Sequence, residues 1–378
     1  MKLNYKIFAT ASALAAAAVP GTANADVPQD VLNNVIANIL QNIRDQIQSR
    51  RLVVPVPGRM QFTGEEVEFS NRDPFAVQGA SNPFAALAYA KAPTMAAPPS
   101  PAWIYGANLI GSGDKTYTFN GLASTTIWSA TAVGAFDATK IGVFTATDAI
   151  TFVLTGSNTW AHTFSGGPLV AATWFDSGTP SASGTISYIN GGFSADFTAS
   201  ASWTHSSSDL ALAAPADSSA MTYTGNAQYR FDFPYHIFFE PTGGVTYTEI
   251  YTMNFGTKTG DTTEVHAGGR VGTEMQWMGF TVQPSISGAV FRNVDCSGTG
   301  CGTGGLPPGF LFPGAPAGVA GMTDLGLGGR GSAKINVIWT PHFSTYVEAH
   351  GSGYAGTKNQ IIPATQTMGA QAGARYTW

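Results

Sequence analysis

The stretch TEVHAGGRVGTEMQW, Thr263 to Trp277, alternates between two kinds of side chain at every step. One set of positions is apolar and ends on an aromatic ring, whereas the other carries ionisable groups such as Glu264 and Arg270. Because successive side chains of a β-strand point to opposite faces, the pattern predicts a strand with one apolar and one charged face. In a soluble sheet the charged face meets water. In a membrane barrel the apolar face meets lipid and the charged face lines the lumen.

Three further stretches repeat this two-residue period, at residues 193–203, 221–233 and 368–378. In each of them Ala, Met and aromatic side chains share one parity. Ser, Thr, Asn, Gln, Arg and Asp share the other parity, apart from scattered glycines. Four alternating stretches of this quality predict that strands dominate the chain.

The composition decides between the two kinds of sheet. Only 11% of the 378 residues are charged, whereas soluble domains have about 25%. Beyond the N-terminus the sequence has no apolar run of about 18 residues, which argues against membrane-spanning helices. Few charges, 45 glycines and alternating aromatics are typical of a transmembrane antiparallel β-barrel, and we expect this all-β fold.

The junctions between the expected strands alternate in length, as they do in membrane barrels. We expect twelve strands, at residues 102–111, 125–137, 148–160, 184–189, 192–205, 220–233, 236–254, 262–277, 279–294, 330–340, 342–354 and 365–378. The even junctions are short and the odd ones long, which places both ends of the barrel in the periplasm. The third and fourth strands are the least defined, because residues 166–183 are also compatible with an extra hairpin.

The N-terminus has the pattern of a secretory signal peptide. Lys2 and Lys6 precede a short apolar segment, and Ala23-Asn24-Ala25 matches the small-x-small cleavage pattern. Residues 1–25 are therefore expected to be removed. Because the peptide contains two of the 18 basic residues and none of the 23 acidic ones, the mature charge is 16 − 23 = −7. The chain lacks a basic patch and is not expected to bind nucleic acid.

Residues 26–51 are expected to form an amphipathic helix, because apolar side chains recur at helical spacing from Val31 to Ile47. Three placements are open: on a periplasmic or surface partner, in a self-associating coiled coil, or inside the pore. The first is favoured, and the last is disfavoured because a polar lumen offers little to an apolar stripe. Residues 52–101 are rich in Pro, Ala and Gly and are expected to form an extended linker to a barrel at 102–378.

Nine ionisable residues fall on the luminal parity of the expected strands. They are Arg230, Asp232, Glu240, Glu264, Arg270, Glu274, Lys334, Glu348 and Arg375. Two interpretations stay open: a charge ladder that sets the ion preference of a pore, or pairs between neighbouring strands that stiffen the wall. Pairing is favoured, because it is the simplest way to satisfy charges inside a narrow barrel.

Aromatic residues on the opposite parity are expected near the membrane surfaces. Tyr376 and Trp378 end the last strand and are interpreted as an assembly signal that also anchors the barrel at the interface. The other candidates for the aromatic belt are Trp103, Trp128, Trp203, Trp277 and Trp339.

The two cysteines, Cys296 and Cys301, lie in a short Gly-rich stretch. In an oxidising compartment they are expected to form a disulfide, since a zinc site would need two further ligands nearby. We expect no metal site and no cofactor.

Some outer-membrane barrels are hydrolases, and one short motif of this sequence is relevant to that class. His205-Ser206-Ser207 has the His-x-Ser spacing seen in lipid A deacylases, with Asp209 as a possible acid. This spacing recurs freely in Ser-rich loops, and no Gly-x-Ser-x-Gly or His-Glu-x-x-His motif occurs. We therefore expect no catalytic residues.

Several short motifs, taken together in their order and spacing, resemble the autotransporter β-barrel domain of Gram-negative outer-membrane proteins. They are VGAFD at 133–137, YINGGF at 188–193, FEPTGGVTY at 239–247, GGRVG at 268–272 and GARYTW at 373–378. The resemblance covers roughly residues 102–378. It implies a twelve-stranded barrel in outer-membrane lipid and export by a signal peptide. It also implies insertion by the outer-membrane assembly machinery, which reads the aromatic last strand, with periplasmic chaperones as further partners.

The chain departs from this family in one respect. Members carry a long passenger between signal and barrel, whereas here only residues 26–101 stand in that place, without a repeat array. We therefore expect a non-enzymatic translocator-type barrel with a short or vestigial passenger. The alternative is a porin-like outer-membrane channel for small solutes.

Overall fold

A computed structural model describes residues 39–41, 43–45, 103–119, 124–145, 148–167, 170–208, 217–298, 327–354 and 364–378. The expected signal peptide, the linker and Cys301 lie outside these residues. Within them, no helix has the length and apolar character needed to cross a membrane.

Strands account for nearly all of the described chain. Their bounds are β1 Trp103–Phe119, β2 Ser124–Ile141, β3 Asp148–Gly167, β4 Val170–Asn190, β5 Phe193–Ser208, β6 Ser218–Tyr229, β7 Phe231–Phe233, β8 Ile237–Thr252, β9 Lys258–Thr273, β10 Met275–Trp277, β11 Phe280–Gly298, β12 Leu327–Thr340, β13 Phe343–Tyr354 and β14 Ala364–Thr377. Two short 3-10 turns, η1 Pro234–His236 and η2 Met253–Phe255, flank β8.

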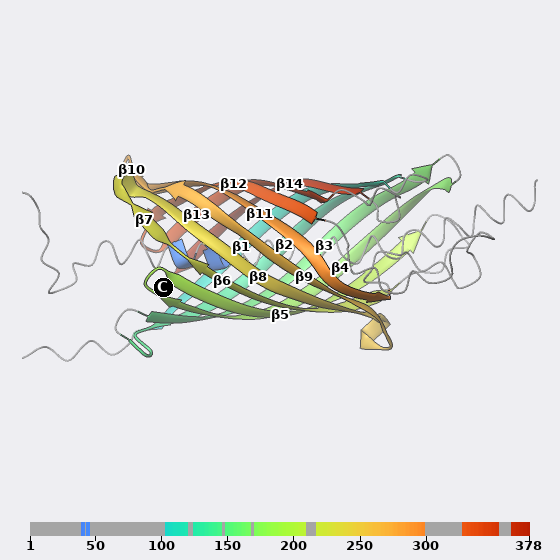
Figure 1. The fold of residues 1–378 in the computed structure, drawn as a ribbon, viewed down its shortest axis with the longest axis horizontal. Coiled ribbons are helices and arrows are strands. Elements are labelled where there is room, and N and C mark those ends of the chain that lie inside the picture. The colour runs from blue at the N-terminus through green and yellow to red at the C-terminus, as the bar shows by residue number, and fades with distance from the viewer. Residues whose placement is uncertain are drawn as a thin grey trace, which may run out of the picture.

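The strands close into a barrel, which Figure 1 shows from the side. Each strand pairs antiparallel with its neighbours along the chain, and β1 also pairs with β14. The segments β6 and β7 are one strand interrupted at Arg230, and β9 and β10 are one strand interrupted at Glu274. The fourteen segments therefore make a closed barrel of twelve strands, as predicted.

The wall separates the two kinds of side chain. On β1, Leu109 is 69% exposed on the outside, whereas its neighbour Ile110 faces the lumen and is 3% exposed. Hydroxyl groups of adjacent strands pair on the luminal face, as between Thr131 and Thr159 at 2.8 Å. The outward residues Phe197 and Ile186 are more than half exposed. The fold class expected from the alternation is confirmed.

The expected strand bounds differ from the observed ones mainly at one end of the barrel, the end opposite the one that carries Trp378. Residues 166–183 do not form an extra hairpin, because β3 pairs with β4 from Asp148↔Asn190 to Gly167↔Val170. Two residues, 168–169, separate β3 from β4, and four residues, 120–123, separate β1 from β2. The first and third junctions are therefore short and not long. These segments are rich in Ser, Thr and Gly and therefore resemble loops in the sequence. In the structure they continue the strands, because they pair with the neighbouring strand.

Tight turns join the strands at the end that carries Trp378. Between β10 and β11, Met278 and Gly279 have φ angles of 51° and 90°, as a two-residue hairpin turn requires. Between β2 and β3, the buried carboxylate of Asp148 accepts hydrogen bonds from the backbone N–H groups of Val143, Phe144 and Thr145 at 2.8–3.1 Å. These turns fix the register of the wall around the lumen.

Candidate functional site

A short helix lies inside the barrel, near the end that carries the C-terminus (Figure 1). We call it the luminal helix; the structure describes its residues 39–41 and 43–45. Ile39, Leu40 and Ile43 are 0%, 3% and 1% exposed, and they belong to one apolar cluster with luminal side chains of the wall. The wall residues of this cluster are Ile110, Val133, Ala135, Ala149, Val153, Ile189 and Tyr346.

The favoured expectation, a helix docked on a partner outside the barrel, is wrong. It rested on a uniformly polar lumen, but the walls of β1 to β4 present aliphatic side chains such as Val133 and Val153 to the lumen. The apolar stripe of the helix therefore has a matching surface inside the barrel, and its burial there removes apolar area from water.

The opposite side of the luminal helix is ionic. Asp45 lies 2.8 Å from the guanidinium of Arg270, which also donates to Glu240 at 2.8 Å. Arg44 pairs with Asp196 on β5, and Gln41 donates to Glu240 at 3.3 Å. The helix is thus held by the luminal faces of β5, β8 and β9.

The electrostatics of this contact favour charged partners. Burial alone would raise the pKa of the Asp45 carboxyl on the luminal helix, but Arg270 and, at longer range, Lys334 and Arg230 hold this pKa below its ordinary value. Buried pairs of this kind gain little net stability, yet removing one partner leaves an uncompensated charge and costs about 3–5 kcal/mol. The ion pairs therefore specify where the helix sits more than they add to its burial energy.

Arg230 and Arg270 share one aromatic platform. Their guanidinium carbons lie 4.2 and 4.7 Å from the ring centroid of Phe238, which is 1% exposed. Arg230 also pairs with Asp232 at 2.7 Å and lies 3.7 Å from Glu274. The two strand interruptions, at Arg230 and Glu274, thus bring opposite charges together in the lumen.

A second ionic network lies behind the closing seam of the barrel. Arg375 on β14 lies 2.6 Å from Asp137 on β2, and Asn108 on the intervening β1 donates to Asp137 at 3.0 Å. Asp137 is 0% exposed. This network joins three strands across the point where the last strand meets the first.

The remaining predicted charges occupy two further places. Lys334 and Glu348 are buried in the lumen and directly opposite in register, and the ammonium of Lys334 lies 4.7 Å from the ring centroid of Tyr346. Glu264 lies 3.4 Å from Arg330 and 3.5 Å from His266.

Of the nine predicted charges, the structure brings four together beside the luminal helix: Arg230, Glu240, Arg270 and Glu274. Asp232 differs, because its side chain is 70% exposed at the rim. Our prediction omitted five buried partners, which are Arg44, Asp45, Asp114, Asp137 and Asp196. Strand alternation marks Asp137 and Asp196, whereas Asp114, which pairs with His350 at 2.6 Å, lies beyond the expected end of the first strand. Nothing in the sequence marks the helix residues as luminal.

Tyr376 and Trp378 lie on the outer wall and are 54% and 53% exposed. The backbone of Trp378 exchanges two hydrogen bonds with that of Tyr105, at 3.0 and 3.3 Å, and their rings stack 6.4 Å apart. Phe136 of β2 lies 6.1 Å from Trp378. The end of the chain is therefore built into an aromatic cluster over the seam.

In the described part of the chain, no group of three or more His, Cys, Asp or Glu side chains is arranged to hold a metal. Cys296 is not a free thiol, and its predicted partner Cys301 lies outside the described residues. The bond between them stays a prediction.

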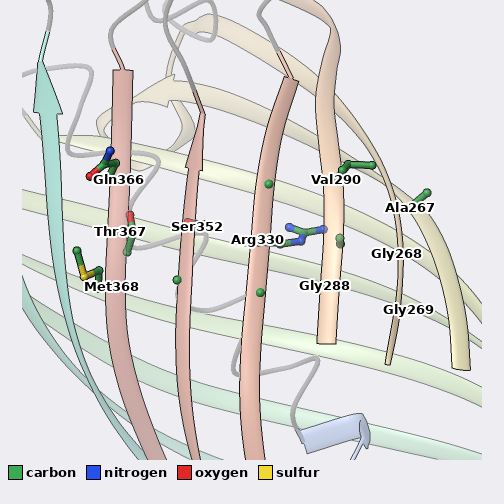
Figure 2. Close-up of a pocket in the computed structure, with 14 residues that line it drawn as sticks. Ala267, Gly268, Gly269, Gly288, Val290, Arg330, Ser352, Gln366, Thr367 and Met368 are labelled. Carbon is green, nitrogen blue, oxygen red and sulfur yellow. The ribbon is translucent and has the colours of Figure 1, made fainter. Parts of the chain in front are cut away.

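An open depression of about 770 Å³ crosses β9 to β14 (Figure 2). Gly269, Gly288, Gly331 and Gly351 follow one another in register across four strands and leave the wall bare. Exposed Val290 and Met368 line it, which places the depression on the outer wall and apart from the lumen.

The sequence matches no known family model and no curated protein. Among solved structures it is similar to the β domain of the Bordetella autotransporter BrkA, with a TM-score of 0.51 and 15% identity over 72% of this chain and 99% of that chain. The chain has the fold of an autotransporter β domain. It is also similar to the transport unit of the autotransporter AIDA-I from Escherichia coli, with a TM-score of 0.50 and 12% identity over 72% of this chain and 89% of that chain. At 15% and 12% identity, these two comparisons show that the autotransporter-type barrel shares its fold with both structures.

Proposed function

We propose that the chain is an outer-membrane translocator-type barrel of a Gram-negative cell whose own N-terminal segment occupies the lumen. The observation that carries this proposal is the luminal helix, whose Arg44 and Asp45 pair with wall residues of opposite charge. Residues 26–101 take the place of a short passenger. The proposed role belongs to the lumen.

Outer-membrane lipid is the surrounding medium in this proposal, because apolar side chains cover the outer wall and aromatic rings gather near its ends. The outer-membrane insertion machinery and periplasmic chaperones are the proposed partners in assembly. The aromatic seam at Trp378 is the feature that supports them.

Single-channel recording in planar bilayers tests the proposal. The mature chain is expected to conduct little, because the helix fills part of the lumen, and deletion of residues 26–101 is expected to give large, steady conductance. The deleted barrel must show heat-modifiable migration on gels, which reports that it is folded. Large, steady conductance of the mature chain would instead support an open channel for small solutes.

Protease treatment of intact cells locates the segment. Cleavage within residues 26–51 from outside supports a displayed passenger, whereas survival of this segment places it in the lumen or periplasm. A periplasmic reporter protein that stays intact shows that the outer membrane was not breached.

A further inference from the structure

The outer wall changes from apolar to polar along β5. Its outward side chains are apolar from Phe193 to Trp203, and Trp203 is 37% exposed. The next two outward positions are His205 and Ser207, and both are exposed. Because Trp residues mark the membrane–water interface in barrels, we expect His205 and Ser207 near the depth where lipid acyl chains meet their head groups.

Asp217 supplies the acid that sequence reasoning did not find. Its Oδ1 lies 2.9 Å from Nδ1 of His205, and its side chain is 16% exposed, compared with 76% for His205. The backbone N–H of Ser206 also donates to Oδ1 of Asp217, at 3.4 Å. Asp217 therefore favours the proton on Nδ1, which makes Nε2 the basic nitrogen of His205. Asp209, the acid considered from the sequence, lies outside the described residues.

Ser207 is on the same face of the strand as His205, about 7 Å away along the backbone. Its hydroxyl donates to the carbonyl oxygen of Asp176 at 3.5 Å, at the limit of hydrogen-bond distance. To reach His205 this hydroxyl would have to leave the Asp176 carbonyl for another staggered rotamer of Ser207. Contacts between a catalytic nucleophile and its base are commonly loose in the absence of substrate.

The wall beside His205 is bare. Gly178 on β4 is the register partner of His205, and a Cβ at Gly178 would meet no atom within 4 Å. Below this gap, the apolar outer faces of β4 and β5 include Ile186 and Phe197, which are 53% and 54% exposed. An acyl chain lying on these faces would bring its ester group beside His205 and Ser207.

We propose that Ser207, His205 and Asp217 form an esterase site that hydrolyses ester-linked acyl chains of membrane lipids. Oγ of Ser207 attacks the acyl carbonyl carbon and Nε2 of His205 takes its proton. The ester C–O bond breaks, the alcohol leaves with that proton, and Ser207 carries the acyl group. Water then attacks this acyl-serine by the same route, which releases the fatty acid and restores the hydroxyl. The site is on the outer wall and does not depend on the role of the lumen.

The mature chain, folded in detergent micelles, is tested with a fluorophosphonate label and with p-nitrophenyl octanoate. The wild type is expected to be labelled at Ser207 and to hydrolyse the ester. Ser207→Ala abolishes both, and His205→Ala lowers hydrolysis about 10²–10⁴-fold. Two variants serve as controls and are expected to retain activity: Ser206→Ala, on the luminal parity, and His236→Ala, an exposed histidine in the turn η1 at the opposite end of the barrel.

Asp217 is a positioning residue, so its variants need a separate readout. Asp217→Asn is expected to lower kcat more than it changes KM and to shift the pH profile, and Asp217→Glu is expected to retain more activity. Heat-modifiable migration on gels identifies folded variants. A wild type that is neither labelled nor active overturns the proposal, as does undiminished hydrolysis by Ser207→Ala. Hydrolysis of p-nitrophenyl acetate without hydrolysis of the octanoate overturns the assignment to lipid acyl chains.

Discussion

At the scale of single residues, Arg270 connects the wall to the luminal helix. It pairs with Asp45 on the helix and with Glu240 on the neighbouring strand, and each contact is 2.8 Å long. One guanidinium thus neutralises two buried carboxylates. Arg270 rests on the ring of Phe238, which limits the directions its planar group can take.

Arg270→Ala is expected to loosen the luminal helix, because it leaves Asp45 and Glu240 buried without their cation, at about 3–5 kcal/mol. Single-channel recordings should show frequent openings that the wild type lacks. The matched control is Arg330→Ala, since Arg330 faces the lumen but pairs with Glu264 and contacts the ring of Phe291. Equal opening by both variants would contradict the assignment.

A second prediction at this scale concerns the thiols. Four residues separate Cys296 from Cys301, and in an oxidising compartment they are expected to form a disulfide. Titration of the unfolded, unreduced protein should find no free thiol, and titration after reduction should find two. Two reactive thiols in the unreduced protein would refute this bond.

At the scale of elements, the seam between β1 and β14 depends on the end of the chain. The two strands pair from Gly106↔Thr377 to Phe119↔Ala364, and Tyr105 continues the ladder with Trp378. Arg375 and Asp137 support this seam from the luminal side. The last strand therefore closes the barrel through its backbone, its charges and its aromatic rings.

Deletion of Trp378 is expected to lower the amount of folded barrel in membranes, because it removes two backbone hydrogen bonds and the stacked ring at the seam. Trp378→Ala keeps the backbone and should have a smaller effect. Trp339→Ala is the matched control, since Trp339 is an outward Trp on β12, away from the seam. Heat-modifiable migration on gels measures the folded fraction. A normal folded fraction after the deletion would count against this role.

At the scale of the whole molecule, the barrel inverts the arrangement of a soluble protein. Aromatic and aliphatic side chains such as Phe197 and Val347 remain exposed on the outer wall, while Arg375 and Asp137 are buried inside. The inversion is stable only when lipid or detergent surrounds the wall, because exposed apolar area is unfavourable in water.

Val347→Arg tests this inversion at a position on β13 where the side chain is 61% exposed. Placing a charge in the lipid-facing belt is expected to reduce the free energy of unfolding by about 2–4 kcal/mol near the midplane. Urea unfolding in lipid vesicles measures the change, with Val347→Ala as the control for lost side-chain volume. An arginine variant no less stable than the alanine variant would place Val347 outside the lipid belt.

The sequence by itself determined the wall. Alternation at two-residue spacing assigned a face to Arg270, Arg375 and Trp277 without any knowledge of their partners, because the pleat of a strand is a local property. It also gave the number of strands. It did not give where β1 and β4 end, since pairing with a neighbouring strand, and not local composition, extends a Ser- and Thr-rich segment.

Only the tertiary structure decided what the lumen holds. Ile110, Val133, Val153 and Ile189 lie on four different strands, and they form one apolar surface only when the register of the closed barrel aligns them. The luminal helix fits that surface, and Asp45 meets Arg270 across 225 positions of the chain. A local pattern describes the side chains of one strand. The affinity of the lumen for a helix depends on the contacts that the luminal side chains of several strands make together.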